Sequence, residues 1–244
     1  MAKKRLDILL VERGLLPSRE KARRAIRAGL VAVDGHPSDK PGRAVESGAG
    51  IELLSPPRYV GRGGEKLKGA LEDFGLSPAG RVALDLGSST GGFTDCLLQE
   101  GARRVYCLDV GRGQLAWKLR RDPRVVVKEG FNARYLTPGD LPEEPDLITI
   151  DLAFISLKKV LSPAAGVLAA PGEILALVKP QFEARRPEIG RGGVVRDPEV
   201  RRRVTGEIAE YGRSLGLTVR GVRESRLPGP AGNREFFLLL SRDA

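Results

Sequence analysis

The sequence predicts an α/β protein in which a small α+β module precedes a doubly wound, mostly parallel sheet with an antiparallel edge strand. Strand-like and helix-like stretches alternate from residue 63 to the end of the chain, as in parallel sheets covered by helices on both faces. The first 54 residues instead show two short helical patterns and then short strands. Prolines and glycines gather between these parts. We therefore expect domains at 1–54 and 63–244, joined by a linker at 55–62.

The front module begins with a helical pattern over residues 5–13, where leucines repeat on one face and Gly14 ends the pattern. A second helix is expected between Ser18, a typical N-cap residue, and Gly29. Alternating valines at 31–33 then predict a short strand. This order of two helices and small strands resembles the S4 RNA-binding domain.

An arginine stripe runs along the second of these helices. Arg19, Arg23 and Arg27 repeat every four residues, on a different face from Ala22 and Ile26. Such a stripe can be a plain solvated face. The planar fork of arginine also matches phosphate geometry, so the stripe is a candidate RNA contact.

The second domain is expected to begin with a strand, a glycine loop and a helix within 81–101. Further strands are predicted within 103–111, 124–130, 146–154 and 173–179. Helices are predicted near 112–120, 157–169 and 198–215. The final antiparallel pair of strands is predicted near 217–226 and 234–241.

The glycine loop "DLGSSTGGF" follows the first of these strands. Its spacing fits neither a dinucleotide fingerprint nor a phosphate loop. It resembles the first motif of class I S-adenosylmethionine (SAM)-dependent methyltransferases, and the glycines could also simply form a tight strand–helix turn. The resemblance implies that residues of the loop hold the methionine end of the cofactor and that Asp109 binds the ribose hydroxyls. Asn132 would contact the adenine, although it could equally be a turn residue. The expected cofactor-binding residues are therefore Asp85, Gly87, Ser88, Ser89, Thr90, Gly91, Gly92, Phe93, Asp109 and Asn132.

Two charged residues end neighbouring predicted strands. Asp151 closes "LITID" and Lys179 closes "ILALVK", where Pro180 stops the strand. The carboxyl ends of parallel strands share one rim, and ligands of open α/β sheets bind there. We therefore expect the two side chains to be close neighbours beside the cofactor crevice.

Several blocks carry a resemblance that covers essentially the whole chain: "SREKARRAIRAGLVAVDG", "GRGGEKL", "DLGSSTGGFTD", "KPQFE" and "GGVVRDP". They are similar to the TlyA family of rRNA 2′-O-methyltransferases, historically called hemolysins, in which an S4 domain precedes an FtsJ/RrmJ-like domain. The resemblance implies methylation of cytidine ribose in large-subunit (23S) rRNA and, in some members, in small-subunit (16S) rRNA. Tyr59 departs from the family pattern, which often has tryptophan there.

The same resemblance implies a catalytic tetrad of Lys66, Asp151, Lys179 and Glu235. We expect Lys179 to act as the general base that takes the proton of the ribose 2′-hydroxyl, oriented by Asp151. Lys66 and Glu235 would position the hydroxyl and steer the neighbouring amine. The sequence leaves open how far these neighbours adjust the proton affinity of that amine, since they act in opposite directions.

The segment 182–198 is long and rich in glycine and arginine, which indicates either a loop that closes over a nucleotide or an idle surface loop. The arginines expected to contact RNA are Arg5, Arg19, Arg23, Arg27, Arg62, Arg185, Arg186, Arg191 and Arg196.

The net charge of +10 favours an anionic partner, with nucleic acid first and anionic lipid second. No stretch approaches the roughly 20 apolar residues of a membrane span, and no signal peptide is expected. Cys96 and Cys107 are expected to be buried free thiols, consistent with a cytoplasmic protein, and their spacing suggests no metal site.

Three other functions stay open from the residues alone. A non-catalytic RNA-binding or ribosome-assembly factor could keep a methyltransferase fold. A small-molecule methyltransferase would leave the basic front module unexplained, and a pore-forming hemolysin would need a membrane segment. The modified nucleotide, the choice of ribosomal subunit, naked rRNA or assembled particle as substrate, and the oligomeric state are not fixed by the sequence.

Overall fold

The computed structural model describes residues 3–55 and 57–244. Pro56, part of the expected linker, lies outside the described residues. The chain divides into two compact units, Met1–Pro57 and Arg58–Ala244. Residues 58–62 of the expected linker therefore belong to the second unit.

The first unit packs two helices against short strands. α1 (Leu6–Glu12) and α2 (Arg19–Arg27) lie beside a three-stranded sheet of β3 (His36–Pro37), β2 (Val31–Val33) and β5 (Ile51–Leu53), while β1 (Lys3–Arg5) pairs with β4 (Ala44–Glu46). The expected N-cap is confirmed, because Ser18 Oγ accepts a hydrogen bond from the backbone N–H of Lys21. Leu10 and Ile26 are fully buried between the helices. The apolar faces predicted from the sequence thus form the core of this unit.

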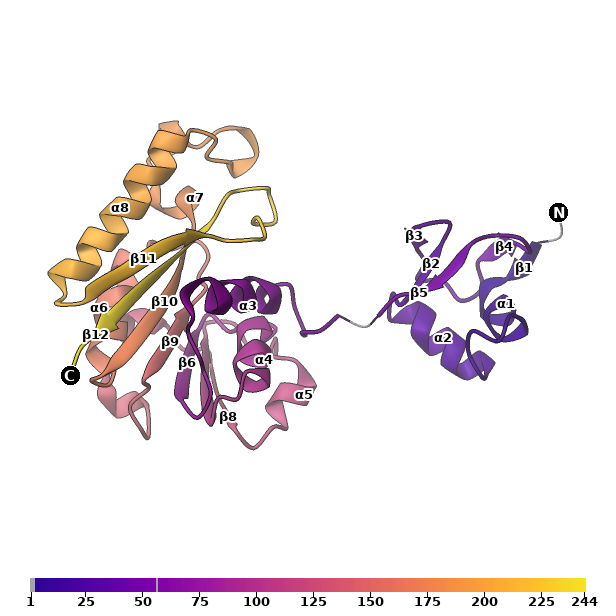
Figure 1. Ribbon diagram of the computed structural model, residues 1–244, viewed down its shortest axis with the longest axis horizontal. Coiled ribbons are helices and arrows are strands. Elements are labelled where there is room, and N and C mark those ends of the chain that lie inside the picture. The colour runs from indigo at the N-terminus through magenta and orange to yellow at the C-terminus, as the bar shows by residue number, and fades with distance from the viewer. Residues whose placement is uncertain (1–2, 56) are drawn as a thin grey trace. The chain divides into compact units, whose positions relative to one another are not determined.

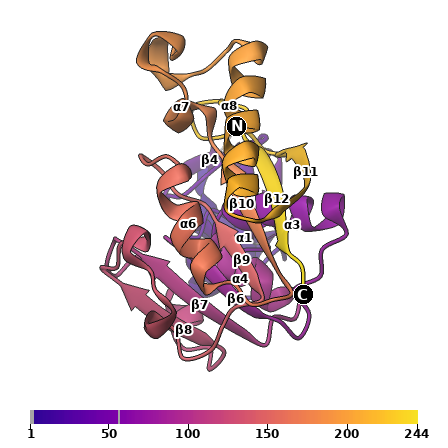
Figure 2. The ribbon, with the colours of Figure 1, turned by 90° about the vertical axis from the view of Figure 1, so that its left-hand side faces the viewer.

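The second unit is built on a seven-stranded sheet in the order β11-β12-β10-β9-β6-β7-β8. Figure 1 shows this sheet, and β7 is labelled in Figure 2. The five parallel strands are β6 (Val82–Leu86), β7 (Arg104–Asp109), β8 (Val125–Glu129), β9 (Leu147–Ile150) and β10 (Gly172–Val178). β11 (Thr218–Glu224) and β12 (Phe236–Arg242) are antiparallel. The predicted sheet and its antiparallel edge pair are confirmed.

Helices cover both faces of this sheet. α3 (Gly63–Phe74), α4 (Gly92–Gln99) and the short α5 (Trp117–Arg120) lie on one face, and α6 (Lys158–Val167) and α8 (Pro198–Ser214) lie on the other (Figures 1 and 2). α7 (Pro180–Glu183) and four single 3₁₀ turns, Ala133–Tyr135, Pro138–Asp140, Arg186–Glu188 and Arg191–Gly193, complete the second unit. Within residues 3–55 and 57–244, none of the helices combines the length and apolar character needed to cross a membrane.

The helix predicted near 112–120 is wrong in its first half. α5 spans only Trp117–Arg120. Gly113 has a φ of +71°, and its N–H donates a hydrogen bond to Glu129, so the preceding residues form a turn that the helical pattern does not reveal.

Alternation along the strands assigns each side chain to one of the two helical layers. In β6, Leu84 and Leu86 pack toward α6 and α8, whereas Ala83 packs toward α3 and α4. Asp85 therefore belongs to the α3–α4 layer, directly opposite Thr149 of β9 in the strand register. Burial on both faces is why the strands read as nearly continuous apolar runs.

Tight packing between α3 and the preceding segment yields the first prediction. A Cβ added to Gly64 would lie 2.2 Å from Cγ of Tyr59, which is buried. Gly64→Ala should lower the stability of the second unit by about 1–3 kcal/mol, measured as a fall in Tm by scanning calorimetry. The matched control is Gly206→Ala in α8, where an added Cβ meets nothing within 4 Å and the helix should gain about 0.5–1 kcal/mol. Equal Tm values for both variants would contradict this packing.

Candidate active site

The site forms where the parallel strands end. Asp151 directly follows β9 and Lys179 directly follows β10, and these two strands are neighbours in the sheet. Lys179 Nζ lies 2.5 Å from Asp151 Oδ1, so the two groups form an ion pair that is largely shielded from solvent. Pro180, at the first position of α7, ends the strand at this point.

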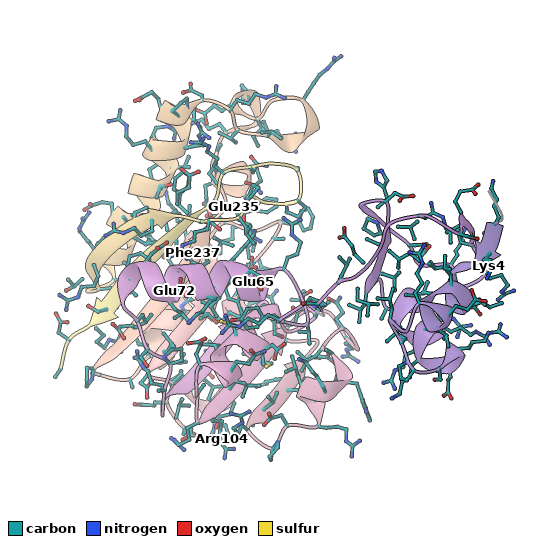
Figure 3. The ribbon with its side chains drawn as sticks, turned by 45° about the vertical axis from the view of Figure 1, so that its right-hand side comes forward. Lys4, Glu65, Glu72, Arg104, Glu235 and Phe237 are labelled. Atoms are coloured by element: carbon teal, nitrogen blue, oxygen red, sulfur yellow. The ribbon has the colours of Figure 1, made fainter. Side chains whose placement is uncertain are left out.

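A second ion pair lies beside the first. Lys66 lies on α3. Glu235, labelled in Figure 3, directly precedes β12. Lys66 Nζ donates a 2.5 Å hydrogen bond to Glu235 Oε2, although 169 positions separate the two residues in sequence. Glu235 is 1% exposed, and its Oε1 has no hydrogen-bond partner among the described residues. One carboxylate oxygen is therefore buried without a hydrogen-bond partner, with Gly229 packed against it.

All four members of the expected tetrad line one cavity of about 190 Å³. The remaining lining residues are Arg62, Gly63, Pro228 and Pro230. The two cations and two anions balance, so the cavity presents paired amines and carboxylates without a net charge from these four groups. This is an arrangement suited to moving a proton over a short distance.

A larger cavity of about 550 Å³ opens at the ends of β6, β7 and β9. Four members of the expected cofactor set line it: Gly87, Ser89, Asp109 and Asn132. Asp151 lines both this cavity and the tetrad cavity. The Lys179–Asp151 ion pair therefore lies where the two cavities adjoin.

Backbone donors hold the carboxylate of Asp109 in place. Asp109 Oδ2 accepts a hydrogen bond of 2.8 Å from the N–H of Ser89, and Oδ1 accepts one of 2.6 Å from the N–H of Gly111. Asn132 caps a 3₁₀ turn by accepting a bond from Arg134 N–H through Oδ1. Both residues face the cavity with part of their hydrogen-bonding capacity already fixed.

Gly87 has to be a glycine. Its φ is +88°, and an added Cβ would lie 2.4 Å from the carbonyl oxygen of Asp151. The backbone of the glycine loop thus packs directly against the backbone at the strand end that carries Asp151. Only glycine, which has no Cβ, allows two backbones to approach this closely.

The other residues of the expected cofactor set do not line the cavity: Asp85, Ser88, Thr90, Gly91, Gly92 and Phe93. Phe93 stacks on Phe237 between the sheet and α4, with ring centroids 6.1 Å apart. Asp85 is fully buried below the loop and accepts hydrogen bonds from Thr94 and Thr149. These residues support the shape of the loop.

Burial raises the pKa of Asp85 to about 7, even though the hydroxyl groups of Thr94 and Thr149 favour its charged form. A carboxyl group held in an apolar layer with two hydroxyl donors is partly neutral near physiological pH.

The arginines of the front module divide into two kinds. Arg19, Arg23 and Arg27 line one surface hollow of about 730 Å³ along α2. Arg23 and Arg27 have no ion-pair partner in the described part of the chain. Arg5 and Arg19 instead both contact the buried carboxylate of Asp7, at 3.0 and 3.1 Å. Arg5 and Arg19 therefore stabilise the fold of this unit, whether or not they also contact RNA.

The arginine-bearing loop, residues 184–197, folds into 3₁₀ turns and a bridge between Gly190 and Val194. Arg185, Arg186, Arg191 and Arg196 are exposed on it. The last three make no side-chain hydrogen bond or ion pair within residues 3–55 and 57–244. Arg62 lies elsewhere, at the tetrad cavity.

Sequence reasoning missed Phe154. It is 90% exposed, has a φ of +63° and lines the larger cavity three positions after Asp151. Its ring contacts Phe182 at 5.3 Å between centroids. In the sequence, an aromatic residue after a buried strand is expected to be part of the hydrophobic core. The positive φ of Phe154 in the structure accompanies a ring that instead faces solvent.

Comparison with known proteins agrees with this architecture. A family model described as FtsJ-like methyltransferase matches residues 59–242, and one described as S4 domain matches residues 4–51. The 16S/23S rRNA (cytidine-2′-O)-methyltransferase TlyA of Mycobacterium tuberculosis is 49% identical over 97% of this chain and 89% of its own length. YqxC of Bacillus subtilis, named as an rRNA methyltransferase candidate, is 48% identical over 98% of this chain and 85% of its own.

Among solved structures, a hemolysin candidate from Streptococcus thermophilus is 42% identical with a TM-score of 0.77. The match covers 100% of this chain and 90% of that one.

The buried carboxyl of Asp85 yields a pH-dependent prediction. Its pKa is about 7 in the folded chain and near 3.8 when unfolded, so the native state binds this proton more tightly. Its contribution to stability is therefore full below the unfolded pKa and is lost as pH rises through 7. Between pH 5.5 and 8.5 the loss should be about 2 kcal/mol. Asp85→Asn removes this dependence.

The free energy of unfolding of Asp85→Asn, minus that of the unmodified protein, should thus increase by about 2 kcal/mol over that range in urea titrations. A difference that stays constant from pH 5.5 to 8.5 would show that the carboxyl does not titrate in this way.

Proposed function

Because the chain belongs to the TlyA group of the FtsJ-like methyltransferase family, we propose that it methylates a ribose 2′-hydroxyl of rRNA, using SAM. The proposed target is a cytidine of 23S rRNA, with 16S rRNA as a second substrate to be tested. One observation carries the proposal: two lysine–carboxylate pairs close on a single small cavity, which shares Asp151 with a cavity of cofactor size.

The larger cavity fits the cofactor. Its volume of about 550 Å³ lies within the range of small-molecule sites. Asp109 can accept hydrogen bonds from both ribose hydroxyls, Asn132 lies where it can meet a base edge, and Leu108 and Phe131 supply apolar walls. SAM, when bound, supplies an electrophilic methyl group on its sulfonium.

We assign the proton transfer to Lys179. For this step the Lys179 ammonium of the ion pair first releases its proton to solvent. The neutral amine then accepts the proton of the ribose 2′-hydroxyl, and the resulting ammonium pairs again with Asp151 at the 2.5 Å contact. The carboxylate fixes the direction of the amine and stabilises its protonated form. Because Asp151 also lines the larger cavity, the amine is held beside the place where the methyl group must be presented.

Lys66 and Glu235 are assigned to positioning. Oε1 of Glu235 is unpaired but buried against Gly229, so a shift of that glycine would let it accept a hydrogen bond from a ribose hydroxyl while Oε2 stays bonded to Lys66. Arg62, at the same cavity and exposed, can hold an adjacent phosphate. Together these groups would bind a sugar and its phosphate rather than a base.

The nucleobase of the target nucleotide needs another binding surface. Phe154 offers an exposed ring at the mouth of the larger cavity, next to the strand end that carries Asp151. Single-stranded RNA is commonly bound by stacking its bases on such rings. We therefore assign Phe154 to the target nucleotide or to its neighbour in the strand.

The basic surface of the front unit is the proposed site of wider RNA contact. Arg23 and Arg27 on α2, with Arg24 between them, line the same exposed hollow. Unpaired guanidinium groups in one row suit successive phosphates. The front unit would thus contribute affinity, and the second unit would contribute the chemistry.

Replacing Lys179 tests its assignment as the general base. Lys179→Ala should lower kcat by about 10²–10⁴-fold, because the proton acceptor is gone, while SAM still binds. The assay is labelled-methyl transfer to total rRNA from a strain that lacks this gene, with calorimetry for cofactor binding. The matched control is Lys68→Ala, on the same helix as Lys66 but paired with Glu100 at 2.9 Å outside the cavity.

Near-normal turnover by Lys179→Ala would refute the assignment. Absence of cofactor binding by the unmodified protein would favour a non-catalytic RNA-binding scaffold instead. Mapping the labelled ribose would identify the nucleotide and the subunit.

Replacing Phe154 tests the stacking surface. Phe154→Ala should cost about 1–3 kcal/mol, or roughly 5- to 150-fold in kcat/KM for RNA, and Phe154→Trp should retain most activity because it keeps an aromatic face. Kinetics with a short single-stranded rRNA fragment give the measurement, and cofactor affinity is the parallel readout. A loss confined to cofactor affinity would place the ring against the cofactor instead.

A further inference from the structure

Asn233 joins two segments that lie far apart in sequence. Its Oδ1 accepts a 2.9 Å hydrogen bond from the N–H of Val195, and its Nδ2 donates a 2.9 Å bond to the carbonyl of Gly193. Val194 between them is extended, with φ −106° and ψ 125°, so both backbone groups face the same side. One side-chain amide thus satisfies both groups, as a neighbouring strand would.

The bridge is buried. Asn233 is 2% exposed and Val195 1% exposed. A buried amide is costly to leave unpaired, so removing either partner affects both segments. These two bonds fasten the arginine-bearing loop, at the point between Arg191 and Arg196, to the segment 228–235.

The segment 228–235 forms a wall of the tetrad cavity. Pro228 and Pro230 line it, and Glu235 ends the segment. Gly229 lies against the carboxylate, since an added Cβ would sit 2.4 Å from Glu235 Oε1. The N–H of Gly229 also donates a 2.9 Å hydrogen bond to the carbonyl of Asn233, which closes the segment into a turn. The bridging residue, the turn and the tetrad carboxylate are therefore connected within one short segment.

The other end of the bridge carries exposed charge. Arg191 and Arg196 have no side-chain partner within residues 3–55 and 57–244, and they flank the two backbone groups that Asn233 holds. A second anchor of the same loop is Glu188, whose carboxylate accepts hydrogen bonds of 2.7 Å from Arg203 of α8. The loop is therefore attached to α8 on one side and to the cavity wall on the other.

We propose that Asn233 is a positioning residue that couples RNA binding on the arginine-bearing loop to the placement of Glu235 in the tetrad cavity. The inference rests on the proposed function. RNA phosphate bound by Arg191 and Arg196 fixes the loop, the Asn233 amide passes this constraint to the segment 228–235, and Glu235 stays against Lys66. Without the amide the loop still binds RNA, but the cavity wall is no longer held by it.

The test uses the full-length protein and measures kcat and KM for rRNA at saturating SAM. Asn233→Ala should lower kcat by about tenfold or more and change KM for rRNA less, with the dissociation constant of SAM within about twofold of normal. The combined variant Arg191→Ala/Arg196→Ala should lower kcat and raise KM for rRNA. In the Asn233→Ala background its effect on kcat should be much smaller, because the route from the loop to the cavity is already broken, while its effect on KM should persist.

The matched control is Ser241→Ala at the opposite end of β12. Ser241 is also buried and its hydroxyl accepts a 2.7 Å hydrogen bond from Arg220. This variant should keep normal kcat even where its Tm falls as much as that of Asn233→Ala. Equal losses of kcat in Asn233→Ala and Ser241→Ala, or losses of kcat that multiply when the loop and Asn233 variants are combined, would overturn the proposal.

Failure of this inference differs from failure of the proposed function. If the unmodified protein transfers no methyl group to unmodified rRNA, the proposed function falls. If it does so and Asn233→Ala matches it in kcat, only the coupling through Asn233 falls.

Discussion

The shared rim of β9 and β10 is the constraint on which the site depends. Neighbouring parallel strands end at the same edge, so a residue directly after each strand is brought close to the other. Here this places the Lys179 amine 2.5 Å from the Asp151 carboxylate. The glycine loop, the base of the larger cavity and the second ion pair are all arranged around that contact. The order of the strands, independently of the loops, therefore places the Lys179–Asp151 pair at this edge.

The sequence predicted what short-range pattern and strand order determine. The apolar runs gave the strands, and the rule for parallel sheets brought Asp151 to Lys179. Lys66 and Glu235 were reached only through family resemblance, since no local pattern relates residues 169 positions apart. Asp85 was expected to contact the cofactor. Side-chain alternation along β6 directs its carboxylate into the buried layer below the glycine loop. Phe154 and Asn233 gave no signal, because their roles arise from backbone conformation and from contacts between distant segments.

Positive charge serves two purposes in this chain. Arg5 and Arg19 satisfy the buried carboxylate of Asp7, and the Arg5 guanidinium above all holds the pKa of that carboxyl below its usual range. Arg23 and Arg27 remain exposed beside them. A net charge of +10 therefore overstates the charge available to RNA, because many arginines are committed to carboxylates of the fold.

The position of Asp151 between two cavities also has a consequence for inhibition. One molecule could fill both spaces if an adenosine-like part met Asp109 and a short arm reached past Asp151 to the two lysines. Many methyltransferases offer an adenosine site, but the smaller cavity of about 190 Å³ with its two ion pairs is a more particular feature. A bisubstrate compound would take its affinity from the first cavity and its selectivity from the second.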